Sequence, residues 1–441
     1  MPIQKLFMAN QNKFSLPRGT ADILPQEVRL WQDIEAKARS LFDLYHYQEI
    51  RTPVFEETEL FARSMGATSD VVQKQMLTLQ PNQREGESGQ SSKIFSLRPE
   101  GTASVVRSYI ENSLDRKEAL TKLFYIGPMF RGERPQKGRL RQFYQIGVEA
   151  IGPNSASPYL DAEIMGLSVA LLKAFGVKDH VLKINTLGSL EDKQNVSTVL
   201  REMIGDQKAS LCPTCQQRLD RNVFRVLDCK NQECQKIVAG LKLGVSLLSQ
   251  QSQEYYAQVK KALGLLGVSF QEVPTLVRGL DYYTQVVFEI TSPSLGSQDA
   301  LGAGGRYNGL VQELGGSEGV DAVGFSLGME RIILARQAVP EPQARGVDVF
   351  VAPIDDKAFE SAFQIMNTLR QQGLASDMSY KTASLKSQMR LADKLSARYV
   401  CILGEDEMNQ NAVTLKDMTT GSQEKISREE IVEKIKKLVL T

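Results

Sequence analysis

The spacing of hydrophobic residues predicts a protein that mixes helices with antiparallel strands. Residues 26–50 carry apolar side chains near helical spacing and then turn extended, and Pro25 suits the first turn of a helix. Residues 121–150 run as strand, charged loop and strand, which predicts an antiparallel hairpin with a long tip. The strand pattern returns at 276–290 and leads into a glycine-rich turn and an apolar segment.

Changes in polarity divide the chain into parts. Residues 191–265 are predicted to be helices around a cysteine-bearing segment and are interpreted as an inserted module. Residues 80–92 are polar and rich in turn formers, which predicts a mobile surface connection. Two prolines in 339–346 favour an extended linker, and alternating strand and helix patterns predict a small α/β domain over 345–441.

Composition and charge narrow the class of protein. The chain has 53 basic and 52 acidic residues, so its net charge of +1 gives no global attraction to nucleic acid or membrane. Any polyanion site must therefore be local. No uncharged apolar run approaches the roughly 18 residues of a membrane span, which predicts a cytoplasmic protein without a membrane partner.

Scarce residues exclude some catalytic chemistry. The two histidines, His46 and His180, lie far apart, which rules out a zinc protease of the HExxH type. The sequence GFSLG fits a serine nucleophile elbow, but no histidine follows Ser326 to complete a hydrolase triad. A Walker A loop is absent as well, and GAGGRY at 302–307 has Tyr307 where a dinucleotide-binding loop needs its third glycine, so neither familiar phosphate loop would hold a nucleotide here.

The hairpin is the most informative stretch. Between residues 122 and 141 it has six basic side chains and one acidic one, which suits a polyanionic partner; an exposed hairpin with ordinary solvated charges is an equally open alternative. On its returning strand, period-two alternation places Gln145, Gly147 and Glu149 on one face. Gly147 would leave a gap in which a small polar ligand could lie between the amide and the carboxylate.

Three further segments combine a turn with polar side chains. Glu100, where a strand leads into a helix, suits either a cationic amine or a plain helix cap. Arg278 with Tyr282 and Tyr283 can bind a phosphate and a small polar group, or can form a structural salt bridge and a core tyrosine pair. Arg331 can meet a polyphosphate or cap a helix.

Taken together, these segments resemble the class II aminoacyl-tRNA synthetases, and within them the histidyl-tRNA synthetase family. The resemblance covers nearly the whole chain except the inserted module. It is carried by LPRGTADILP at 16–25, LRPEGTA at 97–103, FRGERPQKGRLRQF at 130–143, RGLDYYT at 278–284, GGRYNGL at 304–310, GFSLGMERI at 324–332 and SLKSQMRLADKLSARYVCILGEDE at 384–407.

The resemblance implies a fold and a division into domains. It implies an α+β catalytic domain on a mixed, mainly antiparallel sheet, with a helical insertion and a C-terminal α/β anticodon-binding domain. The catalytic domain would comprise residues 1–190 and 266–338, the insertion with its cysteine cluster residues 191–265, and the anticodon-binding domain residues 345–441. It also implies a homodimer.

The resemblance also implies the reaction, in which L-histidine is joined to tRNA(His) through a histidyl-adenylate made from ATP with Mg²⁺. Arg278 and Arg131 would act at the α-phosphate. Histidine would be bound by Glu100, Gly101, Thr102, Gln145, Glu149, Tyr282, Tyr283 and Tyr307, ATP by Arg131, Arg139 and Arg331, and the tRNA acceptor end by Arg134, Gln136 and Lys137.

The chemistry of imidazole binding and of carboxylate activation calls for the same kinds of side chain. A carboxylate and a tyrosine hydroxyl can satisfy the two ring nitrogens of imidazole. The amino-acid carboxylate is already ionised at neutral pH and is itself the nucleophile, so the reaction needs charge stabilisation rather than a general base. The competing functions are a non-catalytic regulatory subunit of ATP phosphoribosyltransferase and an RNA-binding module.

Four cysteines form a separate cluster in the inserted module. Cys212 and Cys215 make a Cys-x-x-Cys pair, and Cys229 and Cys234 follow within about two dozen residues. In a cytosolic chain this grouping favours structural zinc over disulfides. Free thiols remain an open alternative, and no metal ligand is assigned, because the family reaction requires no metal there.

Overall fold

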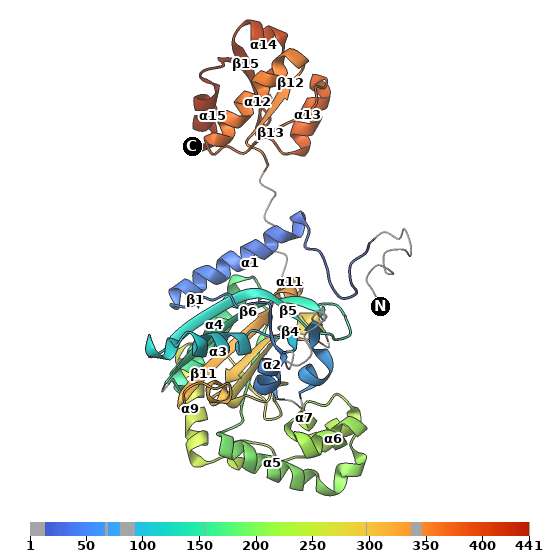
Figure 1. Cartoon of the computed structure of the whole chain (residues 1–441), viewed down its shortest axis with the longest axis vertical. Coiled ribbons are helices and arrows are strands. Elements are labelled where there is room, and N and C mark those ends of the chain that lie inside the picture. Colours follow the sequence, from blue (N-terminus) through green and yellow to red (C-terminus); the bar gives the residue numbers. More distant parts are fainter. Residues whose placement is uncertain are drawn as a thin grey trace, which may run out of the picture. The chain divides into compact units, whose positions relative to one another are not determined.

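The computed structural model describes residues 14–66, 69–79, 93–153, 155–296, 298–336 and 346–440. The chain divides into two compact units, Met1–Glu341 and Pro342–Thr441 (Figure 1). The connection predicted at 80–92 lies outside the described residues, as does most of the linker predicted at 339–346.

An eight-stranded sheet forms the centre of the first unit. Its strand order is β1-β5-β6-β11-β10-β9-β7-β8. The strands are β1 (Gln48–Glu49), β5 (Thr121–Phe130), β6 (Gln142–Pro153), β7 (Val181–Thr186), β8 (Gln271–Glu272), β9 (Thr284–Thr291), β10 (Ala300–Arg306) and β11 (Val320–Gly328). Neighbouring strands are antiparallel except for β1 with β5 and β7 with β8. The predicted mixed, mainly antiparallel sheet is confirmed.

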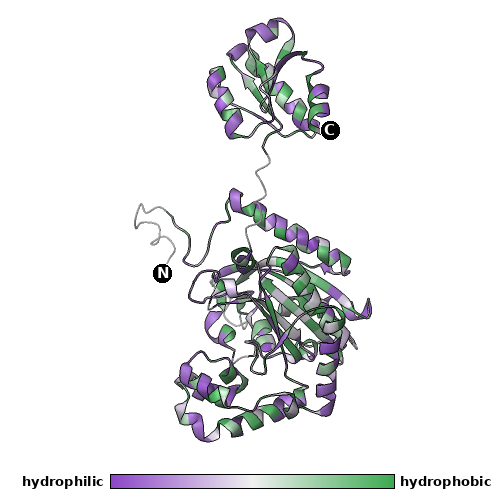
Figure 2. Ribbon diagram, turned by 180° about the vertical axis from the view of Figure 1, so that it is seen from behind, coloured by the Kyte–Doolittle hydropathy of each residue, from purple (hydrophilic) through white to green (hydrophobic). Residues whose placement is uncertain are grey.

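The predicted hairpin is confirmed as β5 and β6, and its two faces differ as the sequence indicated. Ile146, Val148 and Ala150 belong to the larger apolar core, whereas Gln145 and Glu149 point to the opposite face. The larger core packs the sheet against α1 (Pro25–Leu44), α4 (Pro158–Ala174) and α9 (Gln250–Leu265). Figure 2 shows the hydrophobic colouring concentrated in the strands and the polar colouring on the outer helices.

The opposite face of the sheet is covered by short elements that enclose the polar residues. A second apolar core joins α2 and α3 to Leu123 and Tyr125 of β5 and to Val287 of β9. The elements in this region are β2 (Phe55–Glu57), α2 (Thr58–Met65), a π-helix (Val71–Gln75), β3 (Leu77–Leu79), β4 (Phe95–Leu97), α3 (Thr102–Glu111) and α10 (Leu310–Glu313). Helix α11 (Met329–Ala335) packs into the larger core instead. Strands β2, β4 and β3 form a separate sheet.

Helices make up the segment between β7 and β8. They are α5 (Leu190–Ile204), α6 (Pro213–Arg221), α7 (Phe224–Leu227) and α8 (Gln232–Ala239), followed by α9. The cysteine-bearing part has its own small core, which includes Leu200, Leu219 and Val226. Helix α5 begins with a capping box between Ser189 and Asp192, which satisfies amide groups at the first turn.

The second unit is a five-stranded sheet in the order β13-β12-β14-β15-β16 with helices around it. Strands and helices alternate over its first part, which confirms the predicted α/β pattern. The elements are β12 (Val349–Pro353), α12 (Asp356–Gln371), β13 (Ser376–Met378), α13 (Leu385–Lys394), β14 (Tyr399–Leu403), α14 (Glu405–Asn409), β15 (Ala412–Asp417), β16 (Gln423–Ser427) and α15 (Ile431–Leu440). Among the described residues, no helix is long and apolar enough to cross a membrane.

A buried ion pair joins the sheet to its helices. Arg306, at the end of β10, is fully buried and donates to Asp161 of α4, with 2.9 Å between Nε and Oδ1. The Tyr255 hydroxyl of α9 donates to the other carboxylate oxygen at 2.8 Å. Arg306 lies within a motif that could suggest catalysis, but these contacts give it a structural role.

Replacing Asp161 by alanine is expected to lower the free energy of unfolding by about 3 kcal/mol, because Arg306 would remain buried and unpaired. Urea unfolding of the full chain measures this loss. Asp299→Ala is the matched control, since Asp299 is 42% exposed and its ion pair with Lys183 should contribute less than about 1 kcal/mol. Equal losses in the two variants would contradict the structural role of the buried pair.

Candidate active site

A buried carboxyl group lies at the centre of the site. Glu149 of β6 is 1% exposed; the Thr102 hydroxyl donates to it at 2.6 Å, and the Tyr307 hydroxyl donates to its other oxygen. Burial is the main cause that raises the pKa of Glu149 to about 8. A pKa of about 8 favours the protonated carboxyl group near neutral pH, which avoids an uncompensated buried charge.

The space above Gly147 is filled by the protein itself. Tyr125 of β5 pairs with Gly147 in the hairpin, and its ring lies where a Cβ on Gly147 or on Gly101 would be. The interpretation that this glycine leaves a gap for a ligand is therefore wrong, because both glycines make room for the tyrosine. Sequence analysis missed Tyr125, because only the register of β5 against β6 brings its ring beside Gly147.

A third glycine makes room for the carboxyl group. Gly324 of β11 is the register partner of Glu149, and a Cβ on Gly324 would overlap the Glu149 carboxylate. The GFSLG segment therefore owes its first glycine to packing against Glu149. Ser326 is two residues further along the same strand and pairs with Gly147.

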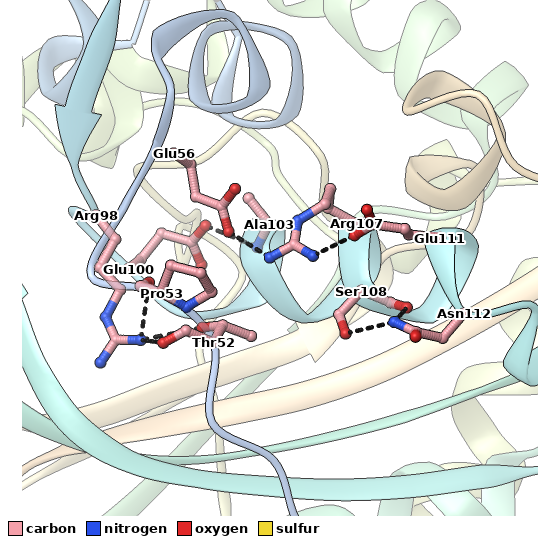
Figure 3. A network of polar contacts seen from close by, with 10 residues as sticks. All are labelled: Thr52, Pro53, Glu56, Arg98, Glu100, Ala103, Arg107, Ser108, Glu111 and Asn112. Carbon is pink, nitrogen blue, oxygen red and sulfur yellow. Dashed lines mark hydrogen bonds and ion pairs between the residues drawn. The ribbon is translucent and has the colours of Figure 1, made fainter.

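Glu100 caps a helix next to the buried carboxyl group. Its carboxylate accepts the backbone N–H groups of Thr102 at 2.6 Å and Ala103 at 2.9 Å, at the start of α3. Figure 3 shows Glu100 turned toward the Ala103 amide, with Arg98 beside it bonded to Thr52 and Pro53. The capping geometry predicted as one alternative is thus present. The remaining lone pairs of the carboxylate can still accept an ammonium group.

An amide and three tyrosines surround the same space. Gln145 is 8% exposed, and its Oε1 atom is buried without a hydrogen-bond partner among the described residues. The rings of Tyr282 and Tyr283 are 4.6 Å apart between centroids, and those of Tyr282 and Tyr307 are 5.5 Å apart. A buried acceptor that lacks a donor is costly, so a ligand that donates there would be favoured.

Three arginines, two from the hairpin and one from α11, lie close enough for their charges to interact. Burial lowers the pKa of Arg131 and of Arg331, and in both cases the charge of Arg139 lowers it further. Protein carbonyls position two of them: Arg131 donates to the Pro99 carbonyl at 2.9 Å and Arg331 to the Ala300 carbonyl at 2.8 Å. Because arginines remain charged at neutral pH, their mutual repulsion favours a bound anion.

Arg278 lies between the tyrosines and β9. Its Nη1 donates to Glu289 at 2.6 Å, which is the salt bridge that the sequence allowed. Its Nε is buried without a partner among the described residues, and its charge acts on Tyr283. The guanidinium is therefore fixed on one side by Glu289 and retains a donor for a ligand.

The tip of the hairpin does not join this group. Arg134, Gln136 and Lys137 are exposed, and a tight turn closes with the Gln136 N–H donating to the Arg139 carbonyl at 3.0 Å. Arg139 itself is turned back toward the protein, where it pairs with Glu133 at 2.9 Å. The tip thus presents polar side chains outward, while the base of the loop contributes arginines to the site.

Glu149 is expected to make the folded protein less stable as the pH rises. Between its ordinary pKa of 4.5 and its raised pKa of about 8, the folded state keeps a proton that the unfolded state has lost. This group should therefore lower the free energy of unfolding by up to about 1.4 kcal/mol per pH unit in that range.

Urea unfolding of wild type and Glu149→Gln at about pH 6 and about pH 8 tests this pH dependence. The loss of stability between the two conditions should be smaller in the variant by about 2 kcal/mol. Equal losses would mean that Glu149 is ionised throughout this range.

The fold and these polar groups define a class II aminoacyl-tRNA synthetase. The family model for histidyl-tRNA synthetase matches residues 19–332, and an anticodon-binding domain model matches residues 348–438. The chain belongs to the histidyl-tRNA synthetase family.

Individual relatives agree with this assignment over most of the chain. The chain is 43% identical to the histidine–tRNA ligase of Halothermothrix orenii, covering 96% of this chain and 99% of that one. It is also 43% identical to the Bacillus cytotoxicus enzyme, with 93% and 96% covered. The apo structure of Staphylococcus aureus histidyl-tRNA synthetase superposes with a TM-score of 0.77 at 34% identity, covering 96% of this chain and 100% of that one.

Proposed function

We propose that this protein ligates L-histidine to tRNA(His) in two steps through a histidyl-adenylate, with ATP and its Mg²⁺ ion as the second substrate. Family membership supports the reaction. Within the site, the observation that carries it is a pair of buried polar atoms that have no partner in the described part of the chain, the Gln145 acceptor and the Arg278 donor. An amino acid provides an ammonium donor, and a nucleotide phosphate provides acceptors, so together the substrates satisfy both atoms.

The pocket around Glu149 would bind the amino acid. Glu149 and Tyr283 would receive the two imidazole nitrogens, with Tyr282 and Tyr307 lining the ring. Glu100, Thr102 and Gln145 would hold the α-ammonium group, near Gly101, where the lack of a side chain leaves room for Tyr125. A pocket that hydrogen-bonds both ring nitrogens rejects amino acids of similar shape that lack them.

The arginines would bind the nucleotide and stabilise the charge that develops. In the first step the histidine carboxylate attacks the α-phosphorus, an oxygen–phosphorus bond forms, and the bond to pyrophosphate breaks. Arg131 and Arg278 would stabilise the added negative charge on the α-phosphate, while Arg139 and Arg331 would bind the outgoing phosphates. No protein group has to remove a proton, because the attacking carboxylate is already ionised.

The second step would transfer histidine from the adenylate to the terminal ribose of tRNA(His), and AMP would leave. The exposed side chains of Arg134, Gln136 and Lys137 would contact the acceptor end, and the second unit would bind the anticodon region. We further propose that the protein acts as a homodimer in the cytoplasm. Light scattering of the purified chain measures the oligomeric state.

Aminoacylation of total tRNA with each standard amino acid in turn tests the proposed function. The expected result is charging with L-histidine and with no other amino acid. The competing function, a regulatory subunit of ATP phosphoribosyltransferase, predicts no charging with any of them. The presence of an anticodon-binding domain over residues 348–438 favours the ligase. A protein that binds only RNA would show no thermal shift with histidine and ATP.

A further inference from the structure

Four thiols of the inserted module converge on one point. The Sγ atoms of Cys212, Cys215, Cys229 and Cys234 all lie within 4.8 Å of one another, and those of Cys212 and Cys229 are 3.9 Å apart. Thiolates at the corners of a tetrahedron around zinc, with Zn–S bonds of about 2.3 Å, are about 3.8 Å from each other. The spacing of the thiols is therefore close to that of a four-cysteine zinc site. None of the four forms a disulfide.

Three short helices bring these thiols together. Cys212 is the N-cap of α6, Cys215 lies in its first turn, Cys229 follows the end of α7, and Cys234 lies in the first turn of α8. Backbone amides already point at the sulfurs: the Cys212 N–H donates to Cys234 Sγ at 3.3 Å, and the Asn231 N–H donates to Cys229 Sγ at 3.5 Å. Such donors stabilise the negative charge of metal-bound thiolates.

The small core around the four thiols indicates that the cluster stabilises the inserted module. The hydrophobic cluster of this module is small, and Cys215 and Cys234 are themselves buried members of it. Small modules with a limited core are commonly stabilised by a metal ion, whose binding then contributes directly to folding.

The helices that carry these thiols also contact the loop that precedes β9. Asn222, between α6 and α7, donates through its side chain to the Asp281 carboxylate at 2.7 Å. Arg218 of α6 and Arg225 of α7 both pair with Asp70, the N-cap of the π-helix, at 2.8 Å and 3.2 Å. Position 281 lies between Arg278 and Tyr283, so Asn222, at the junction of α6 and α7, contacts the segment that carries both site residues.

We propose that Cys212, Cys215, Cys229 and Cys234 bind one zinc ion in a closed tetrahedral site, and that this ion fixes α6 and α7 against the loop from Arg278 to Tyr283. Four protein ligands leave no open position, so the ion is structural and takes no part in the reaction. Zinc binding is independent of the proposed function, whereas the effect on the loop rests on it.

Metal analysis tests the site directly. The full chain, purified without added zinc, should contain about one zinc ion per chain, and Cys212→Ser and Cys229→Ser should contain almost none. These two thiols are half-buried, so serine fits with little disturbance. Cys401→Ala is the matched control, because Cys401 is buried in the other unit and should leave the zinc content unchanged.

A zinc content below about 0.2 per wild-type chain would overturn the site. If a serine variant fails to fold, titration of the wild type with a mercurial reagent provides the second measurement. Release of one zinc ion as four thiols react is the expected result. Reaction of the thiols without zinc release would overturn the proposal.

Equilibrium binding of histidine tests the effect on the loop. In folded Cys229→Ser the dissociation constant for histidine should rise about tenfold, and Asn222→Ala should show a similar rise while keeping its zinc. Cys401→Ala should bind histidine as the wild type does. Unchanged binding in Cys229→Ser, with zinc absent, would overturn the positioning role. Wild-type protein that contains zinc but binds no histidine would instead contradict the proposed function.

Discussion

Replacing Arg278 by alanine is expected to lower the rate of histidine-dependent ATP–pyrophosphate exchange by about 10²- to 10³-fold. The guanidinium is fixed by Glu289 at 2.6 Å and keeps a buried Nε without a partner among the described residues, so it is preorganised for a phosphate oxygen. Loss of a preorganised donor removes stabilisation that develops only in the transition state. The maximal rate should therefore fall much more than the affinity for either substrate.

Glu289→Gln separates this role from a structural one. It removes the charge of the salt bridge but leaves the arginine in place, so the exchange rate should fall by less than about tenfold. If the two variants lose the same activity, Arg278 serves the fold rather than the reaction. If the Arg278→Ala variant exchanges pyrophosphate at the wild-type rate, Arg278 takes no part in the mechanism.

Replacing Glu149 by alanine is expected to raise the KM for histidine by about 10³-fold or more, with the KM for ATP changed by less than about threefold. The carboxyl group is buried between Thr102 and Tyr307, whereas the neighbouring Glu100 carboxylate is engaged with two backbone amides at the start of α3. Without Glu149 the ring nitrogens of histidine would enter a buried pocket with a partner missing. Steady-state exchange kinetics at varied histidine and ATP concentrations give both constants.

Glu149→Gln is the matched control for this effect. The amide retains the shape of the side chain and an oxygen that can accept from Thr102, so the protein should fold, and its KM for histidine should lie between those of wild type and Glu149→Ala. A parallel loss of affinity for histidine and ATP in Glu149→Ala would mean that the group only supports the fold. Thermal unfolding of each variant shows whether the site is intact.

Local patterns were sufficient to predict the scaffold of the site. The hairpin and the placement of Gln145 and Glu149 on one face follow from strand periodicity, which depends only on neighbours along the chain. The turn at Glu100 was likewise recognisable as a helix start, and the structure shows its carboxylate on two backbone amides. Sequence alone left open whether that carboxylate also serves a ligand.

The parts that could not be predicted depend on contacts between distant residues. Tyr125 fills the space above Gly147 because two strands pair in one particular register, and a glycine in a sequence does not tell what occupies the space beside it. Lys193 donates to the backbone carbonyl of Asp281, 88 residues away, at 2.6 Å. Nothing near Arg306 in the sequence distinguishes it from a catalytic arginine. The distinction comes from its buried ion pair with Asp161, which only the structure shows.

Isotope exchange between pyrophosphate and ATP tests the proposed activity most directly, because it requires both substrates in one pocket and needs no tRNA. With labelled pyrophosphate, ATP and Mg²⁺, label should enter ATP when L-histidine is present, and the other standard amino acids should leave it at background. Absence of labelled ATP with L-histidine, in a preparation whose thermal unfolding shows it to be folded, would contradict the assignment of this pocket to histidine activation.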